Sequence, residues 1–329
     1  MTVRAVALLS GGLDSMLAIR VLQLQGIEVE ALNFQTKFAC CQSQAAQAAD
    51  ELGVRLSVLA ERDDYLEVIR NPQHGYGRGA NPCVDCRIFM FRLAAQRMRD
   101  IGALFVASGE IVGQRPMSQK KRDLAVISHR AGLMDHLLRP LSAKLLPPTL
   151  PEREGLVKRE RLFGFSGRGR KELIALAKQF GFTRIPQPST GCALTEPQFG
   201  AKVHDLLGHD PAALAWDFDL LKIGRHIRLD ATTKVIVGRR EEENEKLVRL
   251  FEQRPSERTM LISPENFIGP TALVVSTETE PVDDALRFAG GLILRYAGGE
   301  KMSPTAVVRR GETRTIERLH PAATETATI

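Results

Sequence analysis

The chain has 329 residues, of which 43% are apolar and 26% charged, so it has an ordinary globular composition with room for two domains. Basic residues (45) outnumber acidic residues (39), which is compatible with a polyanionic partner but does not establish one. No apolar stretch is long enough to span a bilayer, and Gly11 and Gly12 interrupt the first apolar run. We therefore expect a cytoplasmic protein with no membrane partner rather than a membrane or secreted one.

The first predicted strand leads directly into a turn that suits a phosphate chain. Apolar residues 3–9 precede Ser-Gly-Gly-Leu-Asp-Ser at residues 10–15, and a helical pattern follows at residues 16–22. A small-residue turn that opens a helix presents free N–H groups and the positive end of the helix dipole to an anion. No Gly-Lys-Ser/Thr follows, so this is not a Walker loop. The alternative is an ordinary turn in which Asp14 caps the helix.

The rest of the first half alternates strand and helix. We expect strands at residues 28–34, 54–59 and 103–107, and helices at residues 43–52 and 87–99. This alternation predicts an α/β fold with a doubly wound parallel sheet, in which ligands lie beyond the carboxyl ends of the strands. The phosphate turn lies at such an end.

The pattern changes after a proline-rich stretch at residues 139–148. Helices are predicted at residues 171–180 and 197–207, then strands at 225–229 and 234–237 and a charged helix at 241–251. We expect a first domain over residues 1–214, a smaller α+β domain over 215–312, and a disordered tail over 313–329.

Three of the five cysteines form the second chemical signal. Cys83 and Cys86 have a spacing that lets both bind one metal centre, and Cys192 in Ser-Thr-Gly-Cys-Ala is a third candidate ligand. Three thiolates fit an iron-sulfur cluster with one open iron, whereas structural zinc, the second choice, requires a fourth ligand. The alternative is a tight turn with unrelated buried cysteines. For Cys40 and Cys41 a packing role is favoured over a sulfur-relay role.

Taken together, these residues resemble the tRNA thiolation enzymes of the PP-loop ATP pyrophosphatases, namely the 4-thiouridine synthetases and 2-thiouridylases. The resemblance covers about residues 3–208 and includes Asn-Pro-Cys-Val-Asp-Cys at 81–86, the segments 107–119 and 139–144, and Thr-Gly-Cys-Ala-Leu-Thr at 190–195. It implies a PP-loop fold of the adenine nucleotide alpha hydrolase kind. A 4-thiouridine synthetase usually has an RNA-binding extension before the turn, and only nine residues precede the turn in this sequence.

The resemblance also implies roles for the turn and the cysteines. ATP would be bound by Ser10, Gly11, Gly12, Asp14 and Ser15, with Mg²⁺ held by Asp14. The two glycines would let the backbone approach the pyrophosphate, and the serines would add hydroxyl donors. A 4Fe-4S cluster would be held by Cys83, Cys86 and Cys192, and these cysteines with Asp14 would be the catalytic residues.

The last third of the sequence resembles the NFACT-R domain, a predicted RNA-binding module. The similarity covers about residues 215–310 and is strongest at Val-Gly-Arg (237–239) and Glu-Asn (243–244). It implies phosphate contacts from four arginines, which are Arg225, Arg228, Arg239 and Arg240. The alternative is a solvated helix face with ordinary pairing, such as Glu242 with Lys246.

The sequence therefore predicts an ATP-dependent tRNA sulfurtransferase that adenylates a uridine carbonyl and replaces its oxygen with sulfur. We expect tRNA and a sulfur donor, either sulfide or a persulfide carrier, as partners, and a homodimer stays an open alternative to a monomer. Two other functions stay open: an ammonia-using PP-loop amidating ligase, and a non-catalytic RNA-binding factor. The sequence does not indicate which uridine is modified, or whether the product is 2-thio or 4-thio.

Overall fold

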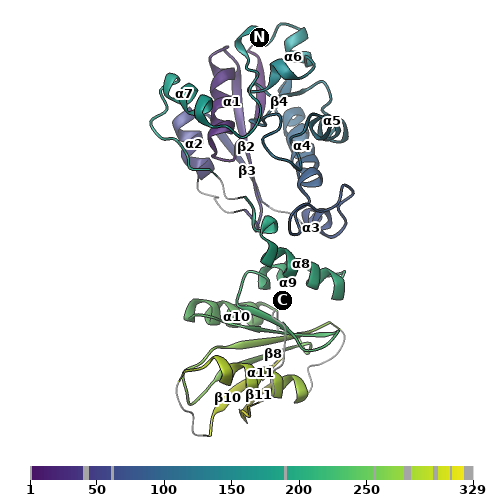
Figure 1. The fold of residues 1–329 in the computed structure, drawn as a ribbon, viewed down its shortest axis with the longest axis vertical. Helices are drawn as coiled ribbons and strands as arrows, with labels where there is room; N and C mark the ends of the chain where they lie inside the picture. The colour runs from purple at the N-terminus through teal and green to yellow at the C-terminus, as the bar shows by residue number, and fades with distance from the viewer. Residues whose placement is uncertain are drawn as a thin grey trace. The chain divides into compact units, whose positions relative to one another are not determined.

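The computed structural model describes residues 2–39, 44–60, 63–188, 191–254, 256–277, 283–298, 303–311, 313–321 and 329. These residues form two compact units, Met1–Thr195 and Glu196–Ile329, called here the first and the second unit (Figure 1). Within the described residues, no helix has the length and apolar character that crossing a membrane requires.

The first unit is built on a parallel sheet of strand order β3-β2-β1-β4-β5. Its strands are β1 (Arg4–Leu8), β2 (Glu28–Gln35), β3 (Arg55–Ala60), β4 (Phe105–Ala107) and β5 (Leu137–Leu138). β1 is central and pairs with β2 and β4, with Ala5 opposite both Val29 and Phe105. Both faces of the central strands are buried, which is why they read as continuous apolar runs.

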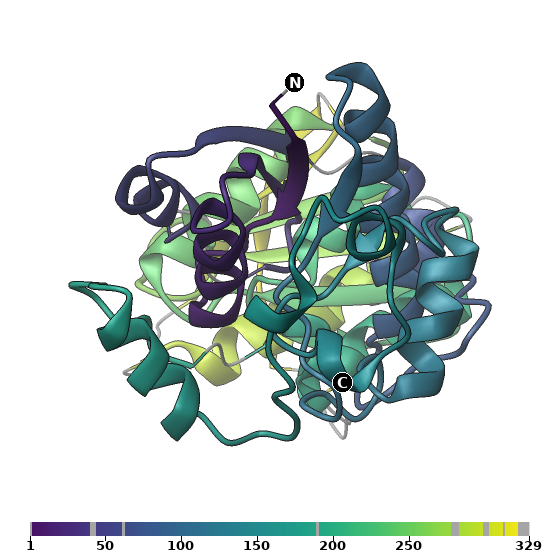
Figure 2. The same ribbon diagram turned by 90° about the horizontal axis from the view of Figure 1, so that it is seen from above.

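Helices cover both faces of this sheet. One face packs against α1 (Leu13–Gln23), α2 (Gln44–Leu52) and α7 (Lys171–Gln179), and the other against α4 (Cys83–Asp100) and α5 (Lys121–Arg130). Figures 1 and 2 show α1 and α4 on opposite sides of β1. The remaining helices are α3 (Asp63–Arg70), α6 (Leu150–Arg153) and the 3₁₀ turns η1 (Ala143–Leu145), η2 (Arg159–Arg161) and η3 (Ala193–Thr195). The predicted doubly wound α/β fold is confirmed.

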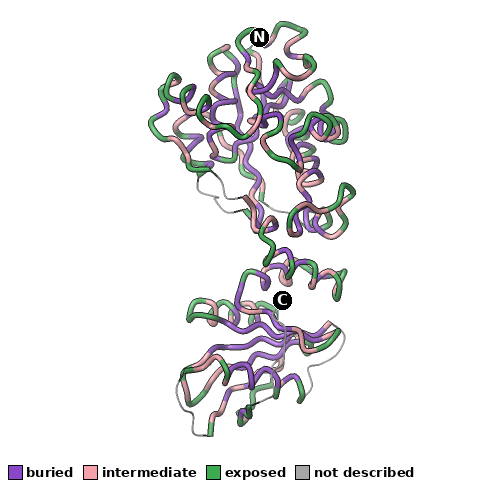
Figure 3. Tube along the Cα trace, in the orientation of Figure 1, coloured by how far each residue is buried: buried purple, intermediate pink, exposed green. Residues whose placement is uncertain are grey.

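The second unit is an antiparallel sheet of strand order β11-β10-β8-β9-β7-β6 between two layers of helices. Its strands are β6 (Arg225–Arg228), β7 (Thr233–Val237), β8 (Thr259–Pro264), β9 (Ala272–Ser276), β10 (Thr305–Arg310) and β11 (Thr313–Arg318). One face packs against α11 (Asp283–Tyr296), and the other against α9 (Ala215–Leu220) and α10 (Glu241–Gln253). The buried strands form the purple centre of this unit in Figure 3.

Two predicted boundaries need correction. The chain divides at residues 195 and 196 rather than 214 and 215, because α8 (Pro197–His209) is bonded to the second unit: Lys202 donates to the carbonyl oxygens of Leu221 and Gly224, each at 3.2 Å. Residues 313–318 of the predicted disordered tail form β11, because they pair with β10 along its whole length. The boundary was misplaced because the amphipathic pattern of α8 fits either neighbour, and β11 was missed because its sequence has no strong apolar periodicity.

Candidate nucleotide and thiol site

The turn at residues 10–12 lies between β1 and α1, at the carboxyl end of the central strand. Gly11 has a left-handed φ of +81°, and a Cβ there would lie 2.6 Å from the backbone carbon of Gln44, so only glycine fits. The hydroxyl of Ser15 donates to the carbonyl oxygen of Gly12 at 2.8 Å, and the Gly12 amide donates to the Ser10 hydroxyl at 3.4 Å. The turn is thus held by its own serines, and the first amides of α1 have no preceding helical turn to donate to.

Asp14 is positioned by the segment that follows β4. The side-chain amide of Gln114 donates to Asp14 Oδ2 at 2.8 Å. Gly109 passes so close that a Cβ on it would lie 2.5 Å from the Asp14 carbonyl carbon. Burial raises the pKa of Asp14, against the Gln114 hydrogen bond and the positive charges of Arg170 and Arg115. A cation beside Asp14 would offset this cost of burying a carboxylate.

A cavity of about 120 Å³ opens beside the turn, beyond the carboxyl ends of β1, β2 and β4. Its lining includes Ser10, Asp14, Ser15, Asn33, Arg87, Met90, Glu110, Gln114 and Arg115. Asn33 donates its amide to the Leu9 carbonyl oxygen at 2.7 Å, which leaves its buried Oδ1 without a hydrogen-bond partner. The cavity is smaller than ligand pockets of roughly 300–1,000 Å³, so it has room for one phosphate or sugar group rather than a whole nucleotide.

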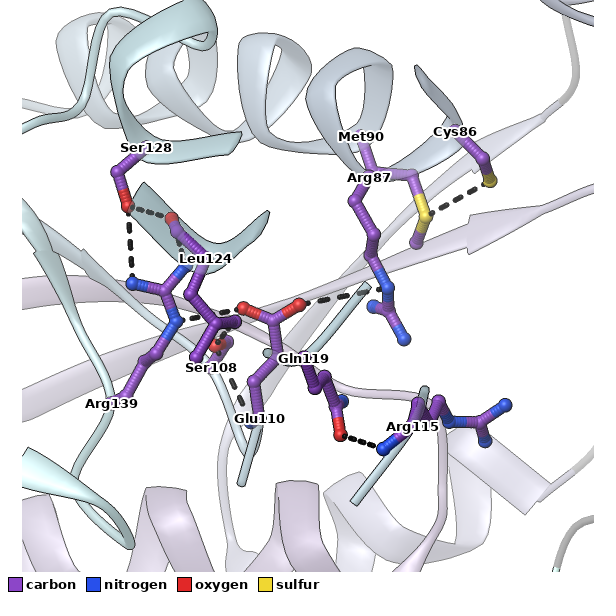
Figure 4. A network of polar contacts seen from close by, with 10 residues as sticks. All are labelled: Cys86, Arg87, Met90, Ser108, Glu110, Arg115, Gln119, Leu124, Ser128 and Arg139. Carbon is purple, nitrogen blue, oxygen red and sulfur yellow. Dashed lines mark hydrogen bonds and ion pairs between the residues drawn. The ribbon is translucent and has the colours of Figure 1, made fainter. Parts of the chain in front are cut away.

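A buried network around Glu110 forms the back of this cavity (Figure 4). Arg139 donates from Nε to Glu110 Oε2 at 2.9 Å, and from Nη1 to the Ser128 hydroxyl at 3.1 Å. On the other side, Arg87 Nε lies 3.7 Å from Glu110 Oε1. Glu110 therefore joins one arginine in the core to another that lies beside the cysteines.

Cys83 and Cys86 lie on the first turn of α4, three residues apart and so on one face of the helix. The predicted helix over residues 87–99 began too late, because Pro82 opens the helix four residues earlier. Cys86 Sγ lies 3.3 Å from the Tyr65 hydroxyl and 3.9 Å from Met90 Sδ. Burial raises the pKa of the Cys86 thiol to about 11, with Tyr65 and Arg87 acting in the opposite direction.

Cys192 is brought to this region by a segment that is tied at two points. The Ala193 amide donates to the Phe38 carbonyl oxygen at 3.0 Å, and the Ala80 amide donates to the Leu194 carbonyl oxygen at 3.0 Å. Residue 80 lies just before the Cys83 turn, so two distant parts of the chain meet here. Cys40 and Cys41 lie outside the described residues.

Arg87 follows Cys86 in α4, and its guanidinium lies within electrostatic range of all three thiols. Burial opposes its charge, but Glu110 and negative charge at Cys86, Cys83 and Cys192 raise the pKa of Arg87 above its usual value. Because Arg87 also lines the cavity beside Asp14, one side chain links the thiols to the phosphate turn. Sequence reasoning missed Asn33, Arg87, Glu110 and Gln114. Only Glu110 and Gln114 lie in a segment that the resemblance had singled out.

The described side chains do not form a ready metal centre. No three His, Cys, Asp or Glu side chains among them lie close enough together to hold one metal ion. The donor chemistry of three thiolates nevertheless matches a cluster with one open iron. The predicted cluster at Cys83, Cys86 and Cys192 and the predicted Mg²⁺ at Asp14 therefore stay predictions.

Two of the four predicted RNA-binding arginines are paired within the second unit. Arg228 donates to both carboxylate oxygens of Asp205, at 3.0 and 2.5 Å, and Arg239 lies 2.5 Å from Glu243 Oε1. The Arg239 side chain lowers the pKa of Glu243 to about 2, against the effect of burial. Arg225 stacks on the Tyr296 ring, with its guanidinium carbon 4.5 Å from the ring centre.

Arg240 differs from the other three. It precedes α10 as its N-cap residue, it is exposed, and no ion pair to it is present among the described residues. Its charge is therefore more available to a partner than those of Arg228 and Arg239.

Comparison with known proteins assigns a domain type to each unit. Residues 3–132 match the tRNA methyl transferase HUP domain, and residues 224–328 match the NFACT protein RNA binding domain. The first unit is thus similar to a HUP domain over residues 3–132 and the second to an NFACT RNA-binding domain over residues 224–328, which confirms the predicted resemblance to the PP-loop tRNA thiolation enzymes and to the NFACT-R module.

Individual proteins are similar to parts of this chain. A tRNA-specific 2-thiouridylase MnmA from Bradyrhizobium sp. (strain ORS 278) is 32% identical over 138 residues, which cover 37% of this chain and 35% of that protein. The MnmA of Methylobacterium radiotolerans is 28% identical over 258 residues, covering 72% and 63%. The chain thus spans about a third of the length of the first curated relatives. A 4-thiouridine synthetase solved with RNA and ATP is 19% identical and covers 66% of this chain and 53% of that one, with a TM-score of 0.38.

Proposed function

We propose that this protein is an ATP-dependent tRNA sulfurtransferase that converts a uridine to thiouridine. The observation that carries the proposal is the position of Arg87, which lines the cavity beside Asp14, directly follows Cys86 in α4, and lies within electrostatic range of Cys83 and Cys192. A nucleotide site needs no cysteines, and a thiol site needs no phosphate turn. A reaction that first activates an oxygen with ATP and then replaces it with sulfur needs both.

In the proposed first step, the turn and its surroundings hold ATP. The first amides of α1 and the Arg115 guanidinium would bind its phosphates, and the unpartnered Asn33 Oδ1 would accept a hydrogen bond from the nucleotide. Asp14 would hold Mg²⁺, which when bound neutralises the phosphate charge. A uridine carbonyl oxygen then attacks the α-phosphate, so that pyrophosphate leaves and the oxygen carries an adenylate.

In the second step, a hydrosulfide equivalent attacks the activated ring carbon. The carbon–oxygen bond breaks, AMP leaves with that oxygen, and one proton is released, so no oxidant or reductant is consumed. Arg87 would favour the anionic form of the sulfur nucleophile, because its charge lies beside the thiols. Cys83, Cys86 and Cys192 would hold the sulfur in place, and a 4Fe-4S cluster, with zinc as the second choice, would be ligated by the same three thiolates.

The substrate is proposed to be tRNA held by the second unit. The match to an RNA-binding domain supports this, as does the surplus of basic residues. Of Arg225, Arg228, Arg239 and Arg240, the last is the strongest candidate for a phosphate contact, because it is exposed and neither a carboxylate nor an aromatic ring is paired with it in the described chain.

The test is incubation of the full chain with ATP, unmodified tRNA and sulfide, followed by nucleoside analysis of the RNA. The expected result is thiouridine together with AMP and pyrophosphate, and none of these without tRNA. Replacing sulfide by ammonia separates the alternatives, since an amidating ligase would consume ATP with ammonia and leave no sulfur in RNA. A protein that binds tRNA but turns over no ATP with either nucleophile would be a binding factor, and the proposal would fail.

A further inference from the structure

The second unit contains a cavity that no proposed step of the reaction uses. Its volume is about 250 Å³, and it lies between the α8–α9 connection, the end of α10 and the ends of β7 and β9. The residues that matter for its chemistry are Trp216, Arg228, Thr232, Lys234, Arg254 and Arg258. All of them belong to one unit, so the cavity is complete within it.

Lys234 is the most unusual residue of this cavity. It lies in β7, opposite Arg228 of β6 and Val275 of β9, on the sheet face that packs against α9 and α10. Only 6% of its surface is exposed, and its ammonium group has no hydrogen bond or ion pair among the described residues. Burying an ammonium group without a partner is costly, so a fold retains one where something else compensates it.

The neighbouring carboxylates are already engaged. Asp205 accepts two hydrogen bonds from Arg228. Asp217 accepts one from the Leu214 amide at 2.8 Å and pairs with Arg254 Nη1 at 3.8 Å, so Lys234 and Arg258 are the lining cations without a carboxylate partner among the described residues. Neither carboxylate reaches Lys234 as an ion pair.

The lining as a whole has excess positive charge. Four cationic side chains line the cavity, and two carboxylates, Asp210 and Asp217, do so. Among the described residues, Arg258 donates one N–H, from Nη1 to the Thr277 carbonyl oxygen at 2.8 Å, and the rest of its guanidinium has no partner there. A planar guanidinium and a point-charge ammonium that line one cavity are the groups that proteins use for phosphate.

We propose that this cavity binds a phosphate monoester carried on a ribose. The phosphate would accept hydrogen bonds from Lys234 and Arg258, and would give the Lys234 ammonium group the partner that it lacks among the described residues. The volume supports a ribose phosphate rather than a longer ligand, because it is below the roughly 300 Å³ at which pockets for larger molecules begin. Trp216 would lie beside the bound group.

The charges that face Lys234 agree with an anionic ligand. Burial lowers the pKa of Lys234 to about 8; Asp205 and Asp217 oppose this effect, and Arg228 and Lys202 add to it. Buried His226 also faces this lysine. A bound phosphate would raise the pKa of Lys234 again, so phosphate affinity is expected to fall as pH rises above 8 in the free protein.

Two sources carry this chemistry: the phosphorylated end of an RNA chain, and a free sugar phosphate or mononucleotide. We favour RNA as the source because the proposed function involves RNA. Only this choice of source rests on the proposed function. Loss of thiolation activity would not affect binding of ribose 5-phosphate, so the two proposals fail separately.

The experiment uses the fluorescence of Trp216, which is the single tryptophan of the chain and lines the cavity. The full chain is titrated with ribose 5-phosphate, inorganic phosphate and ribose, none of which absorbs near the indole band. Saturable changes with the two phosphates and none with ribose are expected. A short RNA with a 5′-phosphate is then compared with the same RNA lacking it. A tighter complex for the phosphorylated RNA identifies an RNA end as the source, and equal affinities identify the free sugar phosphate.

Variants locate the site. Lys234→Met should weaken ribose 5-phosphate binding about tenfold or more, the loss expected for one charged hydrogen bond. Arg258→Gln is the second variant, and it applies even if Lys234→Met fails to fold. The matched control is Lys246→Met, because Lys246 is exposed on α10, pairs with Glu242 and lies outside this cavity. No fluorescence response to either phosphate, or a response that both cavity variants retain, would overturn the proposal.

Discussion

Asp14 is oriented before any ligand is bound, because Gln114 donates to it across the site from a residue one hundred positions further along the chain. Its carboxylate is half-buried, and burial raises its pKa. A carboxylate that lowers folding stability and lies beside a phosphate turn is more readily explained by a cation that it binds than by packing.

We therefore expect Asp14→Asn to abolish pyrophosphate release while the fold persists. Asparagine keeps an oxygen that accepts the Gln114 hydrogen bond but removes the charge, so activity should fall roughly 10²–10³-fold. The melting temperature should stay the same or rise, since a buried charge is lost. Pyrophosphate release and thermal unfolding are the measurements, with Asp123→Asn on α5 as the control. Full ATP turnover by Asp14→Asn would show that the turn is not the catalytic site.

The cysteines yield a separate prediction. Anaerobically purified protein should be brown, and Cys83→Ala, Cys86→Ala or Cys192→Ala should each remove the iron absorption. The control is Cys41→Ala, which should keep it. A colourless, active protein that contains stoichiometric zinc would rule out the cluster and leave the second choice.

A third prediction concerns two lysines of the second unit, the half-buried Lys202 and the buried Lys234. Burial lowers the pKa values of Lys202 and Lys234 to about 8, from the usual 10.5. Between pH 8 and pH 10.5 these two lysines are protonated in the unfolded chain and largely neutral in the folded chain. The free energy of unfolding should therefore rise as pH rises from 8 towards 10.5. Urea unfolding followed by Trp216 fluorescence measures it. In Lys234→Met the rise should be smaller, and an unchanged rise would contradict the assignment of that pKa.

For the individual site residues, local sequence patterns predicted the turn and the paired cysteines. They did not predict Arg87 and Asn33, which reach the site only in the folded chain. The turn at residues 10–15 and the Cys83–Cys86 spacing are local patterns. Arg87 and Asn33 reach the cavity only because β2 and α4 flank β1, which no spacing in the sequence indicates.

At the level of helices and strands, the residues with the strongest NFACT-R similarity, around Gly238, stabilise the fold. A Cβ on Gly238 would lie 2.1 Å from Asn244 Oδ1, and that oxygen accepts the Thr271 amide at 3.1 Å. The Arg239–Glu243 pair closes the same corner between β7 and α10. The residues that carried the resemblance are therefore packing and capping residues, while the exposed Arg240 is better placed for a ligand.

Gly238→Ala should lower the free energy of unfolding by about 1–3 kcal/mol, because the new methyl group overlaps the Asn244 side chain. Gly208→Ala is the matched control: Gly208 lies in α8 with open space around it, so alanine should be neutral or stabilise the helix by about 0.5–1 kcal/mol. Denaturant unfolding of the two variants measures the difference. Equal stabilities would show that this corner adapts to a side chain.

The helices and strands that were not predicted have weak hydrophobic periodicity or form only by pairing with distant segments. α3, α5, β8 to β11 and α11 were not predicted. β11 is exposed along most of its length and contains charged residues, so only its pairing with β10 makes it a strand. By contrast, β1 and β2, which are buried along most of their lengths, were predicted almost to the residue.

For the molecule as a whole, the division after Thr195 separates the two proposed tasks. Every residue assigned to the nucleotide and thiol site lies before it, and every arginine assigned to RNA lies after it. A chain ending at Thr195 should keep ATP binding and lose most tRNA affinity, together with most of the salt dependence of binding. Filter binding at several salt concentrations measures this. Unchanged affinity and salt slope would mean that the second unit binds something else.

The sequence predicted the fold class of the first unit and the presence of a second, and it misplaced the boundary between them. Helix α8 has an ordinary amphipathic pattern that fits either neighbour. Its assignment depends on Lys202 and Asp205, whose partners Gly224 and Arg228 lie some twenty residues later. Such contacts are properties of the folded chain and have no signature in a local window.

The central position of β1 also determines when the site can form during synthesis. Its neighbour β4 begins at Phe105, about a hundred residues after β1 is made, which at roughly 5–20 residues per second is a delay of roughly 5–20 s. Until then the phosphate turn lacks Gly109 and Gln114, and Cys192 is made later still. A nascent chain therefore displays its glycine turn long before the proposed nucleotide site is complete, and under the proposed function ATP would stabilise this unit only after Gln114 has been made.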